Sequence, residues 1–306
     1  GSNLAVSAPN ADRVRERLAA PDTLVGCDLV PSETTEYADV VLPVTQWAEE
    51  EGTMTNLEGR LLRRRRALPP PDGVRDELQI WHDLAARLGS RVTFSDVASE
   101  VFDELAAASA GGRSDYSGTS HAALDAMSVG PQWPVTDVSP STPRPFSERF
   151  ATPDGKAVLH DVIPGRPDDD LLDDFDLYLV TGRLLAHYQS GAQTRRVREL
   201  AGAEPGAFVA MHPLTAERMG IGEGELVEVT SPRGRAVGIA RLTRDLRPEI
   251  VFMPFHFPKL QAANNVTNDR VDPVSGMPEF KVSAVRIRAV DDAWYDAVAA
   301  GVAVRG

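Results

Sequence analysis

Apolar and polar positions alternate in two ways along the chain, and they predict a mixed first part and a strand-rich last part. Residues 12–18, 77–88 and 95–108 have apolar side chains at helical spacing, whereas residues 23–30 and 39–42 read as short buried strands. The two longer helices each present one apolar stripe, formed by Leu78, Trp81, Leu84 and Leu88 and by Val97, Val101, Leu105 and Ala108. This order of elements predicts an α/β fold.

The chain beyond Phe175 is dominated by short apolar runs separated by turns. These runs predict strands at residues 177–180, 207–211, 226–230, 236–242, 250–254 and 283–290. A short helix from Leu214 to Met219 interrupts them, with Pro213 near its start and Gly220 at its end. Six strands at this spacing predict a closed or nearly closed β-barrel.

Three segments follow from these patterns: an α/β part at residues 1–108, an irregular connecting segment at 109–174, and the barrel at 175–306. The connecting segment is rich in loop chemistry and ends in an acidic run at residues 168–174. That run lacks the residue spacing of a calcium-binding loop, so we expect a solvated acidic loop. The glycines at 220, 222 and 224 follow a helix and precede a strand, which predicts a tight turn and not a dinucleotide fingerprint.

Composition and charge argue against several classes of function and site. The 306 residues include 32 Lys and Arg against 45 Asp and Glu, a formal net charge of −13, which disfavours nucleic acid as a partner. The basic run at residues 63–66 is therefore expected to be an exposed face or a partner for acidic loops. No run approaches the roughly 18 apolar residues of a spanning helix, so we expect no membrane association. Cys27 is the single cysteine, which excludes a disulfide or a cysteine-bound iron–sulfur cluster within this chain.

Two polar stretches lie beside predicted strands, and they carry the candidate chemistry. Thr181-Gly182-Arg183 directly follows a strand, and backbone N–H groups, a hydroxyl and a guanidinium at a strand end suit a phosphate or pyrophosphate. A structural turn is an equally good interpretation of these three residues alone. The second stretch, residues 256–281, contains Asn264 and Lys281, which can bond a purine or pterin edge and neutralise an anion. The six histidines are too far apart in sequence to predict a local metal site.

Several ordered motifs resemble the molybdopterin-dinucleotide oxidoreductases. Their third domain is matched by Glu36-Tyr37-Ala38-Asp39-Val40-Val41-Leu42-Pro43, Trp47-Ala48-Glu49-Glu50-Glu51-Gly52-Thr53 and Asn56-Leu57-Glu58-Gly59-Arg60. Their C-terminal barrel is matched by the run from Thr181 to Arg196, by residues 212–224, and by Asp272-Pro273-Val274-Ser275 with Pro278-Glu279-Phe280-Lys281. The resemblance implies a partial α/β (Rossmann-like) domain followed by a dinucleotide-binding β-barrel of the double-psi type.

Within this family the chain resembles bacterial assimilatory nitrate reductases, with formate dehydrogenase alpha subunits next. The resemblance implies a cofactor, molybdenum bis(molybdopterin guanine dinucleotide), and the reduction of nitrate to nitrite and water by oxygen-atom transfer. It also implies a cytoplasmic protein, an electron-donor protein as a partner, and a [4Fe–4S] cluster in N-terminal domains that this chain does not contain. The chain then corresponds to a C-terminal portion and is expected to lack turnover alone. A non-catalytic β-barrel binding module is the alternative from another class.

The resemblance also implies cofactor-binding residues, position by position. Asn3 matches a loop that closes on one dinucleotide, Asp28 follows Cys27 in a pair that contacts a guanosine, and residues 181–190 match the segment that holds the other cofactor half. The implied contacts are Asn3, Cys27, Asp28, Glu77, Thr181, Gly182, Arg183, Leu184, His187, Ser190, His256, Asn264 and Lys281. No catalytic residue and no metal ligand is implied in this chain. Glu50 stands where related nitrate reductases can have Lys, which is a departure from the family pattern.

Overall fold

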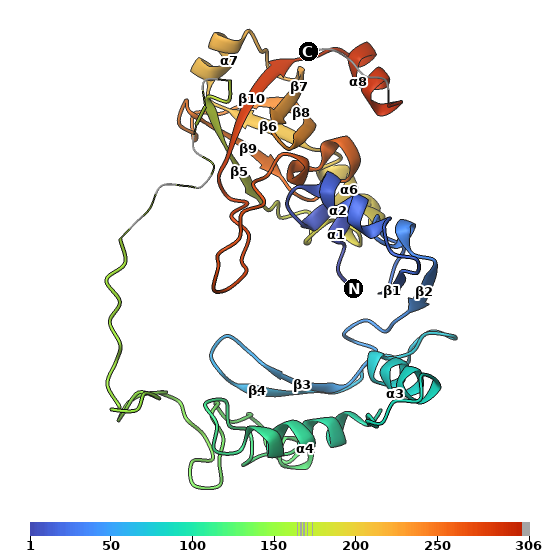
Figure 1. Ribbon diagram of the computed structural model, residues 1–306, viewed down its shortest axis with the longest axis vertical. Helices are drawn as coiled ribbons and strands as arrows, with labels where there is room; N and C mark the ends of the chain where they lie inside the picture. The colour runs from blue at the N-terminus through green and yellow to red at the C-terminus, as the bar shows by residue number, and fades with distance from the viewer. Residues whose placement is uncertain (164, 166, 168, 170, 173, 302–306) are drawn as a thin grey trace. The chain divides into compact units, whose positions relative to one another are not determined.

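The chain forms two compact units in a computed structural model, which describes residues 1–163, 165, 167, 169, 171, 172 and 174–301 (Figure 1). One unit combines Gly1–Val41 with Pro164–Gly306, and the other is Leu42–Ile163. The contacts thus group residues 1–41 with the barrel. The domain boundaries at residues 108 and 174, predicted from composition and from the family resemblance, stay a prediction. The grouping of contacts into compact units does not test them.

The first unit is built around a closed barrel of six strands. The strands are β5 (Leu177–Gly182), β6 (Phe208–Met211), β7 (Leu226–Ser231), β8 (Gly234–Leu242), β9 (Ile250–Pro254) and β10 (Ser283–Ala289). Their order is β10-β5-β9-β6-β8-β7, with β10 also paired to β7, and the pairs β5–β9 and β6–β8 are parallel. The six predicted strands, the closed barrel and the double-psi fold class are therefore confirmed.

The barrel interior explains why the strand pattern was readable. Along β5 buried and partly buried positions alternate, so Leu177 and Leu179 point inward from a pleated strand. Val209, Val229 and Val285 from other strands complete the same apolar cluster, each fully buried. The predicted helix is α7 (Pro213–Met219), capped at its start by His212 and ended by Gly220 in a left-handed conformation.

The first unit also contains further helices and a small separate sheet. They are α1 (Leu4–Ser7), α2 (Ala11–Leu18), β1 (Val25–Asp28), β2 (Val40–Pro43, which ends in the second unit), α6 (Arg198–Ala203) and α8 (Asp292–Ala299). The strands β1 and β2 lie where they were predicted, but the expectation that they are buried is wrong. Val25 is 52% exposed and Val40 is 47% exposed, because β1 and β2 form a two-stranded sheet without further strands.

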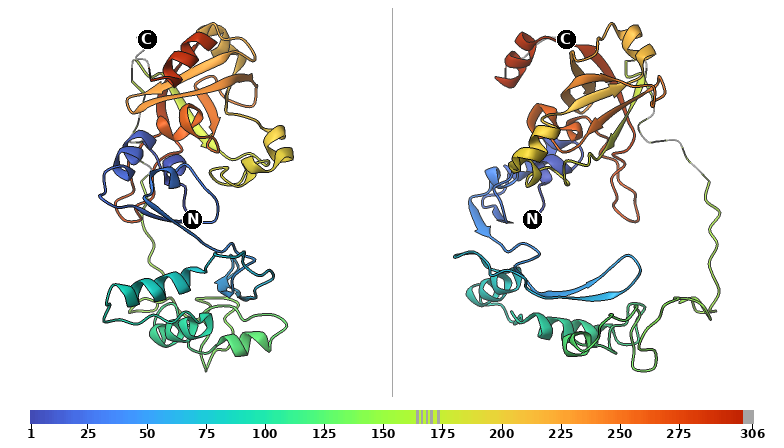
Figure 2. Two further views of the ribbon diagram at one scale, coloured as in Figure 1. Left: turned by 90° about the vertical axis from the view of Figure 1, so that its right-hand side faces the viewer. Right: turned by 180° about the vertical axis from the view of Figure 1, so that it is seen from behind.

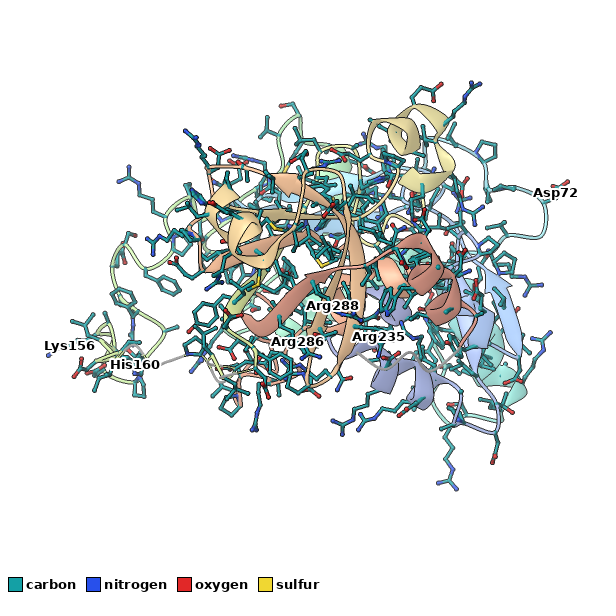
Figure 3. The ribbon with its side chains drawn as sticks, turned by 90° about the horizontal axis from the view of Figure 1, so that it is seen from above. Asp72, Lys156, His160, Arg235, Arg286 and Arg288 are labelled. Carbon is teal, nitrogen blue, oxygen red and sulfur yellow. The ribbon has the colours of Figure 1, made fainter. Side chains whose placement is uncertain are left out.

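A buried carboxylate lies on the outer side of the barrel. Glu228 of β7 is 3% exposed and forms ion pairs with Arg235 of β8 at 3.4 Å and Arg288 of β10 at 2.7 Å. Both guanidinium groups also lie over the ring of Trp294 in α8, and Figure 3 labels the two arginines. These contacts fix α8 against the strands.

The second unit contains a hairpin and three helices. They are β3 (Gly52–Thr55), β4 (Leu61–Arg64), α3 (Glu77–Arg87), α4 (Ala98–Ser109) and α5 (His121–Asp125). The hairpin lies beside α4 (Figure 2), and its small core consists of Leu61, Phe102, Leu124 and Val135. The sequence pattern did not predict this hairpin, although Gly59 at φ +77° marks its turn.

The two predicted apolar stripes of this unit are largely exposed. Trp81 is 51% exposed and Leu105 is 50% exposed, whereas the residues that α4 buries are Phe102 and Ala106. The first stripe and Val101 of the second line a cleft with a volume of about 460 Å³, formed by Leu78, Trp81, Leu84, Ala85, Leu88, Ser90, Phe94, Ser95, Val101 and Glu104. Helical spacing therefore located the helices correctly, but the hairpin packs on a different face of α4.

The basic run at residues 63–66 pairs with carboxylates. Arg63 pairs with Glu51, Arg64 with Glu50, Arg65 with Asp125 and Arg66 with Asp76. The interpretation as a partner for acidic residues is confirmed. The same contacts show what the departure at Glu50 does here, since its carboxylate binds Arg64 at 2.7 Å.

Part of the acidic run at 168–174 can be described. Asp168, Asp170 and Asp173 lie outside the described residues. Asp169 pairs with Arg233 and accepts the backbone N–H of Ala284 at 2.9 Å. Across the part of the chain that the structure describes, no helix combines the length and apolar character needed to cross a membrane.

Candidate functional site

A polar pocket opens where the first residues of the chain meet a loop of the barrel. Its volume is about 280 Å³. Three predicted residues, Asn3, Asp28 and Ser190, line it, although Asn3 and Asp28 were expected to hold one cofactor half and Ser190 the other. The full lining is Gly1, Ser2, Asn3, Ser7, Asp28, Leu29, Val30, Tyr188, Gln189, Ser190, Ala192 and Gln193.

The carboxylate of Asp28 is held in place but keeps acceptor capacity. One oxygen accepts the backbone N–H of Leu29 at 2.8 Å, and the other accepts the hydroxyl of Ser32 at 3.1 Å. A carboxylate offers about four lone-pair sites, so two contacts leave room for two more. Asp28 can thus accept a pair of hydrogen bonds from a ligand with adjacent donors.

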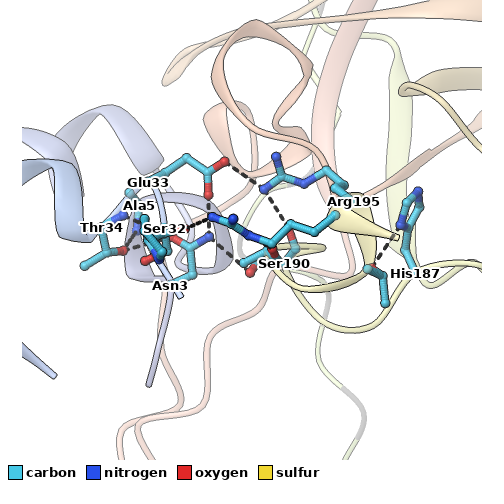
Figure 4. Close-up of polar contacts among 12 residues, drawn as sticks. Asn3, Ala5, Ser32, Glu33, Thr34, His187, Ser190 and Arg195 are labelled. Atoms are coloured by element: carbon cyan, nitrogen blue, oxygen red, sulfur yellow. Dashed lines mark hydrogen bonds and ion pairs between the residues drawn. The ribbon is translucent and has the colours of Figure 1, made fainter. Parts of the chain in front are cut away.

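Asn3 is a largely buried residue of the pocket lining, and its amide group is fully used in hydrogen bonds within the chain (Figure 4). Its amide nitrogen donates to Glu33 at 2.7 Å and to Ser190 at 3.1 Å, while its oxygen accepts the backbone N–H and the hydroxyl of Thr34. Glu33 also pairs with Arg195 at 2.7 Å. Glu33 was missed from the sequence, and no local pattern marks it, because its partners lie about thirty and more than a hundred positions away.

His256 organises the barrel segment that contributes Ser190. Its Nε2 accepts the backbone N–H of Leu184 at 2.8 Å, so Nδ1 bears the proton and donates to the carbonyl of Gln189. Burial is the main cause that lowers the pKa of His256, and the imidazole is neutral in this arrangement. The loop from Leu184 to Gln189 therefore wraps around one buried neutral ring.

Other predicted residues are likewise engaged inside the chain. The ring of His187 bonds the Thr194 hydroxyl at 3.0 Å and the carbonyl of Glu204 at 2.7 Å. The hydroxyl of Thr181 donates to the carbonyl of Phe280 at 3.0 Å.

Asn264 and Gly182 also serve internal contacts. Asn264 donates to the carbonyl of Val6 at 2.7 Å, which joins α1 to the barrel. At Gly182 a Cβ atom would lie 2.5 Å from the Phe252 ring, so the strand end needs glycine. The cofactor contacts expected of these residues and of His187 and Thr181 stay predictions.

The predicted cofactor contacts include two cations, Arg183 and Lys281, and neither has a carboxylate partner among the described residues. Arg183 lies 5.7 Å and Lys281 5.6 Å from the centroid of the Phe255 ring. Lys281 also donates to the carbonyl of Thr181 at 2.8 Å. Partial burial and the Arg183 charge lower the pKa of Lys281. Paired cations with free donors are suited to an anion with several oxygens.

Cys27 and Glu77 also lie outside the pocket lining. Cys27 is a half-buried free thiol next to Asp28 but is not part of the pocket lining. Glu77 is the first residue of α3 in the second unit, and its cofactor contact stays a prediction. Within the described ranges no group of three His, Cys, Asp or Glu side chains is arranged to hold a metal ion.

Comparison with known families identifies the class of protein that this barrel and pocket define. A family profile described as "Molydopterin dinucleotide binding domain" matches residues 177–284, and one described as "Molybdopterin oxidoreductase" matches residues 1–87. The chain is therefore similar to the molybdopterin oxidoreductases over these two segments. The dinucleotide-binding match covers the barrel from β5 to the start of β10, and the other match includes Asn3, Asp28 and Glu33.

Two curated relatives show which molybdopterin enzymes the chain is similar to. The assimilatory nitrate reductase catalytic subunit of Bacillus subtilis is 42% identical over 94% of this chain and 41% of its own length. The F420-dependent formate dehydrogenase 1 subunit alpha of Methanococcus maripaludis is 35% identical over 95% of this chain and 42% of its own length. The chain thus spans about two fifths of the length of these relatives.

A solved structure supports the fold. Acetylene hydratase from Pelobacter acetylenicus matches with a TM-score of 0.68 at 19% identity, over 94% of this chain and 43% of that one. The predicted resemblance to molybdopterin oxidoreductases, and to nitrate reductases among them, is confirmed by these comparisons.

Proposed function

We propose that the chain binds the guanosine end of molybdopterin guanine dinucleotide in the pocket beside Asp28, as part of a nitrate-reducing molybdenum oxidoreductase. The observation that carries the proposal is the carboxylate of Asp28 in a pocket shared with Ser190. Guanine presents adjacent N–H donors on one edge, and a carboxylate accepts both. Adenine lacks this pair of donors, so the pocket favours guanine.

The chemistry of the other free groups fits the rest of the cofactor. Arg183 and Lys281 offer unpaired donors of positive charge, which suit the pyrophosphate that links guanosine to the pterin. Both lie in or beside the strand-end segment that leads into the pocket loop. We include the bis form of the dinucleotide in the proposal because the resemblance of this chain to the molybdopterin oxidoreductases implies it.

When bound, the molybdenum cofactor supplies two-electron oxygen-atom transfer. The residues of this chain bind and orient its nucleotide end. Nitrate is favoured as the substrate by the relative at 42% identity, which is named a nitrate reductase. Formate is the second candidate, favoured by relatives at 35% identity that are named formate dehydrogenases. Reduction of nitrate or oxidation of formate by the holoenzyme, assayed with a viologen dye, separates the two.

The binding proposal is tested by calorimetric titration of the 306-residue chain with GDP and ADP. We expect GDP to bind and ADP to bind at least about tenfold more weakly, because two hydrogen bonds to Asp28 are lost. Asp28→Asn should remove the preference. Asp39→Asn is the matched control, since Asp39 also accepts a backbone N–H at 2.8 Å but lies outside the pocket lining. Equal binding of both nucleotides would refute the proposal.

We also propose a cytoplasmic location and an electron-donor protein as a partner. Both rest on the similarity to the assimilatory nitrate reductase of Bacillus subtilis. Cell fractionation followed by detection of the chain tests the location, and recovery in the membrane or secreted fraction contradicts it.

A further inference from the structure

Three segments that are far apart in sequence meet behind the pocket: residues 1–3, 31–34 and 190–196. Asn3 bonds both Glu33 and Ser190, and Glu33 pairs with Arg195 at 2.7 Å. Arg196 donates to the carbonyl of Pro31 at 2.7 Å. Figure 4 shows that the side chains of Asn3, Glu33 and Arg195 converge between the two elements that carry the pocket walls. We call this set of contacts the clamp.

The clamp reaches Asp28 through one intermediate residue. The hydroxyl of Ser32 donates to the Asp28 carboxylate at 3.1 Å, and Ser32 stands between Pro31 and Glu33. Ser32 is 6% exposed and its backbone is fixed by Thr35, which accepts its N–H at 2.8 Å. The orientation of Asp28 therefore depends on where segment 31–34 is held.

The barrel wall of the pocket depends on the same contacts. Ser190 accepts from Asn3, and the next residue, Gly191, has a φ of +74°. A Cβ at Gly191 would lie 2.6 Å from the carbonyl oxygen of His256 and 3.0 Å from Nε of Arg195, so this turn is closely packed. Any shift of Arg195 therefore moves the turn that carries Ser190.

The pair at the centre of the clamp is shielded from solvent. The Glu33 side chain is 19% exposed and that of Arg195 is 26% exposed. Burial alone raises the pKa of Glu33, but hydrogen bonds from Arg195 and Asn3 outweigh it and leave the pKa below its usual value. The carboxylate is thus charged at neutral pH. A shielded, hydrogen-bonded pair has a defined geometry, which an exposed pair lacks.

We propose that Glu33 and Arg195 are positioning residues that set the selectivity of the pocket for guanine. Their ion pair holds the segment of Asp28 and Ser32 in register with the barrel turn of Ser190. The inference rests on the proposed function, because it concerns how the same pocket recognises its base. Neither side chain lines the pocket, so their effect on the ligand is indirect.

The test compares the binding of GDP and IDP to the full chain by calorimetry. IDP lacks the exocyclic amino group of guanine, so the affinity ratio measures how well Asp28 meets that edge. We expect a GDP preference of about tenfold in the unaltered chain, since one charged hydrogen bond is lost with IDP. Glu33→Gln and Arg195→Met should each bring the ratio close to one, and the double variant should show no further loss.

Two controls separate positioning from general stability. Glu204→Gln removes one partner of another ion pair of this unit, Glu204 with Arg241 at 2.8 Å, in which Glu204 is 23% exposed. It should leave the affinity ratio unchanged. Arg195→Lys retains the charge and should keep part of the preference. Thermal unfolding of every variant verifies that the chain is folded.

The possible results distinguish this inference from the function on which it rests. Loss of the preference in Glu33→Gln and Arg195→Met, with Glu204→Gln unaffected, supports it. An unchanged ratio in Glu33→Gln, additive losses in the double variant, or an equal loss in Glu204→Gln overturns it. If Asp28→Asn removes GDP binding while Glu33→Gln does not alter the ratio, only the positioning role is refuted. If the unaltered chain does not bind GDP, both proposals fail.

Discussion

Arg183 offers a sharp test of where the phosphates bind. Its guanidinium lies 5.7 Å from the Phe255 ring centroid and has no carboxylate partner among the described residues. A hydrogen bond to a charged group contributes about 1.5–3 kcal/mol, and because Arg183 is exposed we expect the lower end of this range. Arg183→Ala should therefore weaken GDP binding by roughly tenfold, since about 1.4 kcal/mol corresponds to that factor.

The assay is a calorimetric titration of the unaltered chain, of Arg183→Ala and of a control variant with GDP and with guanosine. Guanosine has no phosphates, so Arg183→Ala should leave its affinity unchanged. Arg218→Ala is the control, because that guanidinium is also exposed in this unit but pairs with Asp176 at 3.2 Å. If Arg183→Ala weakens guanosine and GDP binding equally, or weakens GDP binding no more than Arg218→Ala does, the assignment of Arg183 to the phosphates is wrong.

Four further variants test other parts of the account. The pKa of His256 in the folded chain is below the ordinary value of 6.5. As the pH drops below 6.5, the unfolded chain therefore binds a proton that the folded chain does not, and the free energy of unfolding falls. The free energy of unfolding, measured by denaturant titration at about pH 5.5 and pH 7.5, should differ less between the two pH values in His256→Gln than in the unaltered chain. An unchanged difference would contradict a neutral His256 ring in the folded chain. Gly182→Ala should cost about 1–3 kcal/mol by overpacking, partly restored by Phe252→Leu in the same denaturant assay. Full stability of Gly182→Ala alone would exclude that clash. Glu228→Gln should destabilise the barrel by about 1–3 kcal/mol in urea, because a buried acceptor of two guanidinium groups is weakened. A loss below about 0.5 kcal/mol would show the pairs to be dispensable. GDP affinity should fall at alkaline pH as Lys281, whose pKa is lowered, loses its charge. In Lys281→Arg this part of the fall should disappear, and identical alkaline affinity profiles of the two chains would argue against a role of Lys281 in binding.

The sequence was informative where local physics decides the structure. The barrel strands are short apolar runs between turns, and in β5 buried positions such as Leu177 and Leu179 alternate with partly buried ones. The start and the end of helix α7 are determined by local residues, Pro213 and Gly220. Burial was less predictable, since Trp81 belongs to a clear helical stripe and is nevertheless half exposed. Which face of a helix is covered depends on tertiary neighbours.

The site was predictable only in part, for a similar reason. The resemblance led to Asn3, Asp28 and Ser190, and the structure brings them to one pocket. The interactions that hold the pocket are not visible in the sequence, because Asn3 and Ser190 are 187 positions apart, and Glu33 and Arg195 are 162 apart. Separations of this size leave no periodic pattern.

The central claim is that this chain binds a guanine pterin dinucleotide through the pocket of Asp28. The most direct measurement is the amount of GMP and oxidised, fluorescent pterin released per chain after purification from a bacterial host that makes the dinucleotide. The account predicts both compounds in equal amounts from the unaltered chain and much less from Asp28→Asn. Release of neither compound from the folded, unaltered chain, or equal release from Asp28→Asn, would contradict it.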